Sequence, residues 1–334
     1  MERRIKDRYS ASILREAMNR YGINQGEIKL LDGFESYMYE FTRNGNGYIL
    51  RIGHSLRRNA ELISGEVDWI NYLTRGGASV SRAVNSVGGR LVESIEDLHG
   101  DCFLATAFEK APGGPPRKEH WNSELYQRYG KLIGRMHALS KEYEPSNSTW
   151  KRPDWDSPII GEIDAWLPPS EAAVLEKHHR LYDDLRSLPQ DGETYGLIHQ
   201  DAHAGNFFVD HEGCITLFDF DDCCYSWYMN DIAIVLFYAV IGQEDPVSFI
   251  HSFMKPFLQG YSTENLVDIS WFEQIPHFLK MREIDLYAVI HRSFDVENIT
   301  DPWVSSYMEG RRDRIMADVP FVNFDWDLLA RYCS

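Results

Sequence analysis

Three oxygen-bearing side chains accompany short apolar stretches in one part of the sequence. Asp201 follows the first stretch, Asn206 opens the second, and Asp219 follows the third. If these stretches are strands, they hold two carboxylates and one amide oxygen at neighbouring strand ends, facing one cleft. Hard oxygen donors of this kind suit Mg²⁺, which binds few protein ligands together with substrate phosphates. The pattern therefore predicts phosphoryl transfer. The stretches cover residues 195–198, 206–209 and 214–218.

Asp201 fits one of the two roles that such a reaction requires. Phosphoryl transfer needs a metal ion that neutralises phosphate charge and one group that aligns the attacking hydroxyl. A carboxylate with a pKa near ~4 cannot deprotonate a free alcohol, but in a loose transition state the proton moves late. Asp201 is therefore predicted to act by orientation more than by basicity.

The composition and net charge of the chain disfavour some classes of binding partner. The chain has 334 residues, of which 43% are hydrophobic and 25% charged, and a formal charge of −17. Its length favours two domains, and its negative charge disfavours nucleic acid and anionic membranes as partners. The longest apolar run, residues 232–241, is too short to span a membrane, and the N-terminal stretch MERRIKDRYS lacks the apolar core of a signal peptide. We therefore expect a cytoplasmic protein, monomeric or homodimeric.

Five cysteines are too few and too scattered for a disulfide framework, and none shows the CxxC spacing of a zinc site. We expect reduced thiols. The adjacent Cys223 and Cys224 are interpreted as small residues in a packed loop after a strand, with a redox pair as the alternative.

The period of the apolar pattern changes along the chain. Short strands separated by turns, with one helix over 59–74, predict an antiparallel meander before the segment AFEKAPGGPP. After it the pattern becomes mainly helical. The expected strands are 28–34, 37–42, 48–52, 90–95 and 102–108, and the expected later helices are 123–141, 171–188, 231–241 and amphipathic segments within 247–314.

The fold class predicted from these elements is α+β, with an antiparallel sheet and helix in a first lobe and a larger, mainly helical second lobe. The Gly- and Pro-rich segment is the expected boundary. The division runs over residues 1–107 for the first lobe, 108–114 for the hinge linker and 115–334 for the second lobe.

The motif HxDxxxxN, formed by His199, Asp201 and Asn206, and the following strand that ends at Asp219 resemble the aminoglycoside phosphotransferase and choline kinase superfamily. That superfamily has a two-lobed protein-kinase-like fold. The resemblance implies that Asp201 is the catalytic carboxylate, that Asn206 and Asp219 hold magnesium, and that His199 braces the loop. It also implies that Asp231 is a buried aspartate that ties its helix to this loop.

The resemblance extends upstream and implies an ATP site. The segment 129–137 resembles the helix of the family that ends in a Leu/Met-His pair. Backbone groups of Ala107, Phe108 and Glu109 would read adenine. Gly33 and Ser36 lie where the family has its nucleotide-covering hairpin, with one glycine in place of a cluster.

Arg51 stands where the family often has a lysine that contacts the α- and β-phosphates. It keeps the charge but has a different shape from a lysine. Glu66 on the following helix is the expected ion-pair partner of Arg51, and Glu61 is the second choice.

Several further residues are candidates for contact with the phosphate acceptor. His203 would contact substrate or phosphate, or else bond to local backbone. Asp221 and Asp222 would provide a second metal contact or attract a cationic substrate, or else form a solvated turn. Aromatic residues near these carboxylates, Trp227 and Tyr228 among them, would hold an ammonium group, or else belong to the core.

By resemblance, the helix with Arg282 lines the acceptor pocket. Arg282 would contact the acceptor, or else pair with Glu283 or Asp285.

These interpretations predict an ATP- and Mg²⁺-dependent kinase that phosphorylates a hydroxyl of a small, amine-bearing molecule. Two alternatives stay open at this point. The loop DAHAGN and the strand end FDFDD also resemble bacterial stress-response kinases that phosphorylate protein Ser and Thr. A catalytically silent pseudokinase, acting as an interaction or coat protein, is the third reading.

Overall fold

The computed structural model describes residues 2–24 and 26–333, which group into two compact units. The first unit comprises Met1–Pro116, Glu142–Arg152 and Asn206–Cys223, and the second comprises Arg117–Lys141, Pro153–Gly205 and Cys224–Ser334. The units therefore do not divide the chain at one point, because two later segments pack with the N-terminal part. The lobe boundary at 108–114 stays a prediction.

An antiparallel sheet forms the centre of the first unit. The strand order is β1-β2-β3-β6-β4, and β5 also pairs with β6. The strands are β1 (Ile28–Leu31), β2 (Tyr37–Arg43), β3 (Asn46–His54), β4 (Ala83–Val84), β5 (Val92–Glu96) and β6 (Cys102–Glu109). The predicted meander is confirmed, although β1 ends three residues before the expected end of its strand.

Two turns explain why the hairpins form where the sequence predicts them. Asn44 and Gly45 have φ values of 53° and 79° and connect the paired residues Arg43 and Asn46. Positive φ at both loop positions matches the twist of the flanking strands. In the β1–β2 connection, a Cβ at Gly33 would lie 2.3 Å from the carbonyl oxygen of Ser36, so only glycine fits there.

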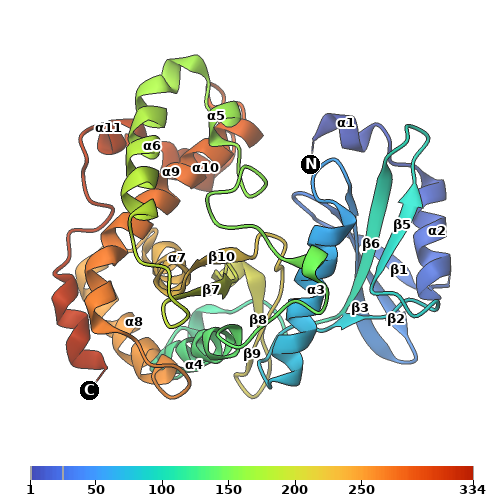
Figure 1. Ribbon diagram of the computed structural model, residues 1–334, viewed down its shortest axis with the longest axis horizontal. Helices are drawn as coiled ribbons and strands as arrows, with labels where there is room; N and C mark the ends of the chain where they lie inside the picture. Colours follow the sequence, from blue (N-terminus) through green and yellow to red (C-terminus); the bar gives the residue numbers. More distant parts are fainter. Residues whose placement is uncertain (1, 25, 334) are drawn as a thin grey trace. The chain divides into compact units, whose positions relative to one another are not determined.

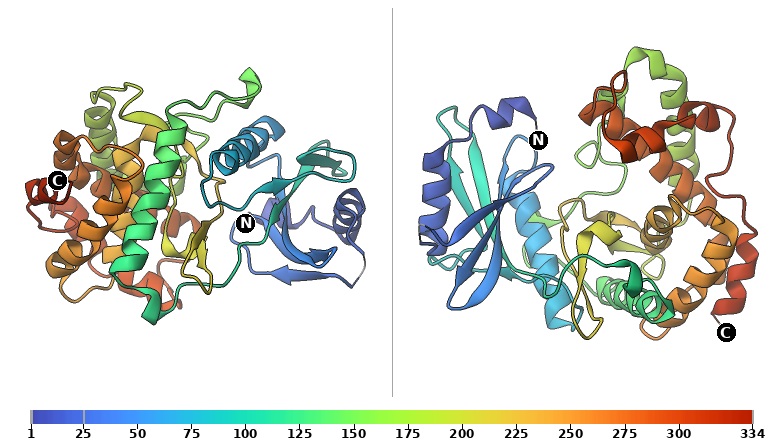
Figure 2. Two further views of the ribbon diagram at one scale, coloured as in Figure 1. Left: turned by 90° about the horizontal axis from the view of Figure 1, so that it is seen from below. Right: turned by 180° about the vertical axis from the view of Figure 1, so that it is seen from behind.

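Helices α2 (Ala11–Tyr21) and α3 (Ala60–Arg75) cover opposite faces of this sheet (Figures 1 and 2). Helix α3 begins after Asn59, whose side chain accepts a hydrogen bond from Leu62 N. A short helix α1 (Arg3–Lys6) precedes α2. Helix α2 is not among the predicted elements, and it buries only four side chains.

A two-stranded hairpin of β8 (Phe207–Val209) and β9 (Ile215–Leu217) also belongs to the first unit. Both strands were predicted and are one or two residues shorter than expected. Val80 bridges Leu217, and Gly114 bridges Val209, so the hairpin packs against loops of the same unit.

The second unit is mainly helical. A two-stranded sheet of β7 (Tyr195–Ile198) and β10 (Cys224–Trp227) lies among its helices. Cys224 is therefore in a strand, which corrects the loop expected for it. The helices are α4 (Ser123–Ser140), α5 (Ile163–Trp166), α6 (Ala172–Arg186), α7 (Tyr228–Val240), α8 (Pro246–Tyr261), α9 (Ile275–Ser293), α10 (Pro302–Met308) and α11 (Arg311–Met316).

Helix α7 is the buried centre of this unit, since nearly all its side chains are inaccessible to solvent. An α-helix that is apolar on every side is expected only inside a core. No helix of the described residues is long and apolar enough to cross a membrane. The α+β class with a sheet in one unit and helices in the other is as predicted.

Helices α4 and α8 approach each other closely through glycines. A Cβ at Gly130 would lie 1.8 Å from the carbonyl oxygen of Phe257, and a Cβ at Gly260 would lie 1.9 Å from that of Gln127. Side chains at these positions would force the two backbones apart. The crossing fixes α4, which carries His137 toward the loop described below.

We expect Gly130→Ala to lower the free energy of unfolding by about 1–3 kcal/mol, because the added methyl group overpacks the α4–α8 contact. Urea denaturation followed by circular dichroism measures this change. Gly192→Ala is the matched control, since nothing lies within 4 Å of its Cβ position, and it should change stability by less than ~0.5 kcal/mol. A Gly130→Ala variant as stable as the wild type would contradict the close crossing.

Candidate active site

The loop after β7 is held by one buried carboxylate. Asp231 Oδ2 accepts a hydrogen bond from His199 N at 3.1 Å, and Oδ1 accepts one from Gln200 N at 2.9 Å. Gln200 has a φ of 69°, a strained conformation for a residue with a side chain. His199 Nδ1 in turn accepts a hydrogen bond from Asp201 N at 3.2 Å. These contacts match the bracing that the resemblance implies for Asp231 and His199.

Asp231 is itself fixed from a second side. Its Oδ2 lies 3.2 Å from His137 Nε2, and His137 Nδ1 lies 2.9 Å from the Tyr261 hydroxyl. Asp231 is fully buried. Burial raises the pKa of Asp231, but the hydrogen bond from His137 and the further contacts lower it more, so its pKa lies below the usual range. The loop therefore rests on an ionised carboxylate.

Asp201 projects from this loop toward α9. Its Oδ1 accepts a hydrogen bond from Arg282 Nη2 at 2.5 Å, and its Oδ2 lies 3.3 Å from His203 Nε2. Burial raises the pKa of Asp201, but Arg282 and His203 lower it more, so its pKa is also below the usual range. Asp201 is thus ionised at neutral pH and accepts hydrogen bonds, as a hydroxyl-orienting group must.

The structure shows which protein groups Arg282 and His203 contact. Arg282 also donates to the Tyr238 hydroxyl at 2.7 Å, so its partners are Asp201 and Tyr238 and not Glu283. His203 Nδ1 accepts a hydrogen bond from Gly205 N at 2.9 Å, which is the local contact weighed above. Contact of either residue with an acceptor stays a prediction.

Asn206 and Asp219 lie at the same end of the β8–β9 hairpin. They flank the register pair Phe207–Leu217, and Phe218 N donates to Asn206 O at 2.9 Å. Asp219 has a φ of 64°. Because one amide and one carboxylate oxygen come from adjacent chain ends, the pair fits the donor set of a Mg²⁺ site. Asp201 belongs to the other unit.

Arg51 and Glu66 form the predicted ion pair. Two hydrogen bonds of 2.8 and 2.6 Å join the guanidinium to the carboxylate, and both residues are buried. Burial lowers the pKa of Arg51, but the charge of Glu66 raises it above its usual value. Glu61, the second candidate, is exposed. A bidentate pair of this kind holds Arg51 in one orientation on β3.

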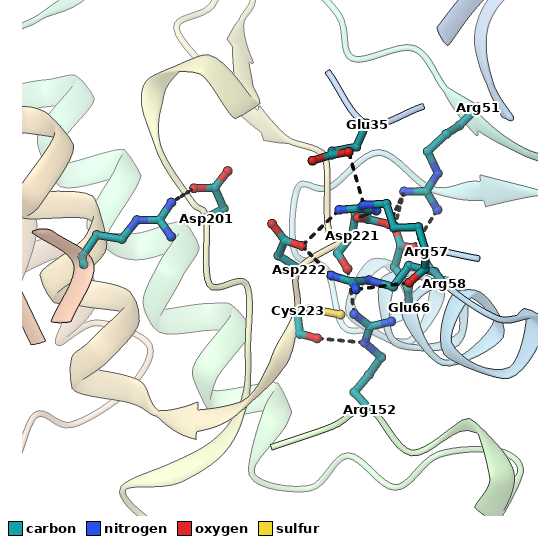
Figure 3. A network of polar contacts seen from close by, with 11 residues as sticks. Glu35, Arg51, Arg57, Arg58, Glu66, Arg152, Asp201, Asp221, Asp222 and Cys223 are labelled. Atoms are coloured by element: carbon teal, nitrogen blue, oxygen red, sulfur yellow. Dashed lines mark hydrogen bonds and ion pairs between the residues drawn. The ribbon is translucent and has the colours of Figure 1, made fainter. Parts of the chain in front are cut away.

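Asp221 and Asp222 pair with Arg57 and Arg58, two arginines that were not among the residues predicted for the site (Figure 3). Asp221 bonds to Arg57 and lies 3.8 Å from Arg51, while Asp222 lies 3.0 Å from Arg58. Burial raises the pKa of Asp221, but Arg57 and its neighbours lower it far more. Asp221 is largely covered by these arginines, whereas Asp222 lies in a turn and keeps 43% of its side-chain surface exposed. The role of both carboxylates toward a metal or acceptor stays a prediction.

Arg152 holds the backbone of Asp221 and Cys223 in place. It is almost fully buried, and its guanidinium donates to Cys223 O at 2.8 Å, Asp221 O at 2.7 Å and Leu62 O at 2.8 Å (Figure 3). The backbone after Asp219 is therefore fixed to α3 through one side chain. No local sequence signal indicates this contact, because Arg152 is far from both segments in the chain.

The backbone expected to read adenine is engaged in the sheet. Ala107 and Phe108 pair with β3 on one side and with β4 on the other, and Glu109 N donates to Arg82 O at 2.9 Å. These residues are thus held at the end of β6, and their contact with adenine stays a prediction. Gly33 and Ser36 lie in the β1–β2 connection, as expected for a nucleotide-covering hairpin.

The two aromatic candidates lie inside the second unit. Trp227 has no exposed surface, and its Nε1 donates to Pro189 O at 2.8 Å, so it belongs to the core and not to an acceptor surface. Tyr228 is 4% exposed and lines a cavity of about 400 Å³ together with Trp271 and Tyr261. The prediction that Trp227 holds an ammonium group is therefore wrong, because its side chain packs inside the second unit.

Asp210, Glu212 and Cys214 bring three possible ligand atoms within 4.8 Å of one another. The Asp210 carboxylate accepts hydrogen bonds from Glu212 N at 2.9 Å and Cys214 N at 2.8 Å. The group is thus the turn between β8 and β9, stabilised by its aspartate. All five cysteines are free thiols, as expected.

A buried carboxylate that sequence reasoning mentioned only as a partner of Arg282 lies on α9. Burial raises the pKa of Asp285 to about 7, and the nearby Arg282 lowers it only in part. Across from it on α6, burial lowers the pKa of His178 to about 4. The only sequence signal was the position of Asp285 one turn after Arg282.

We expect Asp285→Asn to stabilise the protein increasingly as pH rises from about 4 to about 7. The pKa of Asp285 is higher in the folded state than in the unfolded chain, so the wild type loses stability as pH rises between these two values. The amide of the Asp285→Asn variant cannot ionise, so the variant does not lose this stability. Between pH 5 and 8 the stability difference between variant and wild type should grow by about 2 kcal/mol. Urea denaturation at several pH values measures it. A difference that does not change with pH would contradict this environment.

Comparisons with known proteins identify phosphotransferases as relatives of this chain. A family model described as "Phosphotransferase enzyme family" matches residues 27–266. Amicoumacin kinase of Bacillus subtilis (strain 168) is 37% identical over 325 residues, which cover 96% of each chain. The solved structure of amicoumacin kinase hAmiN in complex with AMP-PNP, Ca2+ and Ami has 36% identity and a TM-score of 0.93, and the match covers 98% of this chain and 100% of that one.

A microcompartment-associated aminopropanol kinase has a TM-score of 0.72 at 21% identity, covering 92% of this chain and 98% of that chain, which shows the fold alone. The family match, the full-length relative and the fold all agree with the motif around Asp201. The chain therefore belongs to the phosphotransferase enzyme family, and it is a small-molecule kinase.

Proposed function

We propose that this kinase transfers the γ-phosphate of ATP to a hydroxyl of a small, amine-bearing molecule, and that amicoumacin is a candidate acceptor. The observation that carries the proposal is an ionised Asp201 on a loop whose backbone is fixed by Asp231. The name of the relative that is 37% identical supports the choice of amicoumacin.

In this proposal Asp201 accepts a hydrogen bond from the acceptor hydroxyl. This bond orients the hydroxyl so that a lone pair of its oxygen points at the γ-phosphorus. Because the pKa of Asp201 is low, it takes up the proton late, when the bond to the leaving group has lengthened. Arg282 and His203 hold the carboxylate in position from two sides. The loop contributes orientation, which accounts for a large part of the rate in reactions of this kind.

Asn206 and Asp219 would hold a magnesium ion, which supplies charge neutralisation at the phosphates when bound. Four residues separate Asp201 from Asn206, so the chain keeps their Cα atoms within ~18 Å of each other. Arg51, oriented by Glu66, is proposed to contact the phosphates, and Gly33 and Ser36 to cover them. Backbone groups of Ala107, Phe108 and Glu109, at the start of the linker 108–114, would read adenine.

The proposal also covers partners and location. A small acceptor and ATP are the expected ligands, and the chain acts as a monomer or homodimer in the cytoplasm, where ATP is available. The two-lobed division with a hinge at 108–114 belongs to the same proposal. The family comparisons favour a small-molecule acceptor over the protein kinase and the pseudokinase.

A coupled assay of ADP formation tests the proposed function. It offers ATP and Mg²⁺ with amicoumacin, 1-amino-2-propanol, choline, homoserine and aminoglycosides in turn. ADP formation that depends on an amine-bearing acceptor supports the proposal. Turnover of only neutral or acidic hydroxyl compounds, or phosphate transfer to casein alone, would contradict it.

We expect Asp201→Asn to lower kcat at least ~1000-fold, because the neutral amide cannot accept the hydroxyl proton. Nucleotide binding should be unchanged, since Asp201 is proposed to contact the acceptor and not ATP. The assay above measures kcat, and the thermal shift with ATP and Mg²⁺ measures binding.

Glu212→Gln is the control for this variant, since Glu212 is an exposed carboxylate in the β8–β9 turn. It should keep wild-type kcat. If the Asp201→Asn variant retained more than a few per cent of wild-type activity, another group would be the hydroxyl-orienting residue.

A further inference from the structure

One side chain contacts both groups that hold the Asp201 carboxylate. The Tyr238 hydroxyl accepts a hydrogen bond from Arg282 Nη2 at 2.7 Å, and the Tyr238 ring packs on the ring of His203 with centroids 4.5 Å apart. Arg282 and His203 are the residues that contact Oδ1 and Oδ2 of Asp201. All four residues belong to the second unit. Tyr238 was not among the residues predicted for the site.

The contact with Arg282 fixes one nitrogen atom from two sides. The terminal nitrogen Nη2 carries two N–H groups. It donates to Asp201 Oδ1 at 2.5 Å and to the Tyr238 hydroxyl at 2.7 Å. Cζ of Arg282 also lies 5.2 Å from the centroid of the Tyr238 ring, within the range of a cation–π contact. The position of the guanidinium is therefore set by Asp201 and Tyr238 together.

This second contact matters because Arg282 has another carboxylate near it. Asp285 follows three residues later on the same side of α9, and its charge interacts with that of Arg282. Oδ1 of Asp285 has no hydrogen-bond partner among the described residues. Without the Tyr238 hydroxyl, the guanidinium would divide its contacts between two carboxylates, so its hold on Asp201 would weaken.

The contact with His203 supports the group at the other carboxylate oxygen. His203 Nδ1 accepts a hydrogen bond from Gly205 N at 2.9 Å, so the proton of the neutral ring is on Nε2. Nε2 lies 3.3 Å from Asp201 Oδ2, and 26% of the His203 side chain is exposed. The Tyr238 ring packs against this partly exposed ring and limits its rotation.

Helix α7 gives Tyr238 a rigid base. Within residues 228–240, all side chains are buried except those of Tyr238 and Ala239. Asp231, which fixes the backbone of the loop, lies seven residues before Tyr238. Seven residues make two turns of an α-helix, so the two side chains leave the same side of α7 about 10 Å apart along its axis. One helix therefore supports both the backbone and the carboxylate of Asp201.

We propose that Tyr238 is a positioning residue for phosphoryl transfer, because its hydroxyl and its ring hold Arg282 and His203 against the two oxygens of Asp201. This inference rests on the proposed role of Asp201 in orienting the acceptor hydroxyl. It goes beyond that role by naming the residue that controls the orientation of the carboxylate. Tyr238 acts through its two neighbours and not on the substrate.

Steady-state kinetics of full-length variants test this role. Tyr238→Phe removes the hydroxyl and keeps the ring, and Tyr238→Leu removes both contacts. With ATP, Mg²⁺ and the most active acceptor of the ADP assay, we expect kcat to fall about 10-fold in Tyr238→Phe and further in Tyr238→Leu, because small displacements of an orienting group cost a large part of the rate. The KM for ATP should stay within about twofold of the wild-type value, since neither contact involves the nucleotide.

A double-mutant cycle identifies the route of the effect. Arg282→Met removes the donor that the Tyr238 hydroxyl holds, so Tyr238→Phe should lower kcat less than about twofold in that background. Tyr332→Phe is the matched control, because the Tyr332 hydroxyl bonds to His251 on α8 at 2.6 Å, and it should keep wild-type kcat. An equal loss from Tyr238→Phe in both backgrounds would overturn the proposal, because Tyr238 would then act independently of Arg282.

Crystal structures test the geometry without turnover. In Tyr238→Leu with AMP-PNP and Mg²⁺, we expect Arg282 or His203 to lose its contact with Asp201, while Asp231 keeps its contacts with the loop backbone. A variant in which both groups keep their contacts with Asp201 would overturn the proposal, and so would a Tyr238→Phe variant with wild-type kcat.

Asp201→Asn separates a failure of this inference from a failure of the proposed function. If Asp201→Asn keeps its activity, the proposed role of Asp201 fails, and the role of Tyr238 fails with it. If Asp201→Asn is inactive while both Tyr238 variants keep wild-type kcat, only the positioning role fails. If the wild type phosphorylates no amine-bearing acceptor but its kcat with another acceptor depends on Tyr238 as expected, only the proposed acceptor class fails.

Discussion

The geometry of the reactive loop depends on the interaction between the Asp231 carboxylate and two consecutive backbone amides. A fully buried charge is tolerated only when hydrogen bonds replace its lost hydration. His199 N, Gln200 N and His137 supply them. The same bonds offset the strain of Gln200, whose φ of 69° is needed to turn the chain after β7. Asp201 follows directly, so its position is set by backbone contacts before any ligand binds.

Charged side chains of the first unit are likewise paired with groups of opposite charge. Arg51 is buried with Glu66, and Arg57 and Arg58 meet Asp221 and Asp222 (Figure 3). Removing one partner of a buried pair leaves the other charge uncompensated, which costs about 3–5 kcal/mol. These pairs therefore fix the orientation of β3 and of the chain after Asp219. Between α6 and α9 the pattern differs, because both ring nitrogens of His178 and Oδ1 of Asp285 have no hydrogen-bond partner among the described residues.

Local elements were predictable where the sequence pattern alone determines them. The Asn44-Gly45 turn, β7 and the helix from Ser123 follow from turn chemistry and apolar period. Helix α2 was missed because only four of its side chains are buried and its N-terminal residue Ser10 makes no side-chain capping hydrogen bond. The pair Arg51–Glu66 was predictable because its members lie fifteen residues apart on adjacent elements.

Other parts of the site could not be read from the sequence. Arg57 and Asp221 are 164 residues apart, and no local pattern indicates which distant charges meet. Trp227 shows the opposite difficulty, since a core tryptophan and a ligand-binding one look alike in a sequence. Asp285 was visible only as a neighbour of Arg282, because its burial next to His178 depends on how α6 packs against α9.

We infer that Asp231 acts on catalysis only by positioning Asp201. A double-mutant cycle of kcat with Asp231→Asn, Asp201→Asn and the combined variant tests this claim most directly. We expect Asp231→Asn to lower kcat of the wild type strongly but to lower kcat of Asp201→Asn little further, since the group that Asp231 positions is already lost. Losses that multiply across the two substitutions would contradict it, because Asp231 would then contribute independently of Asp201.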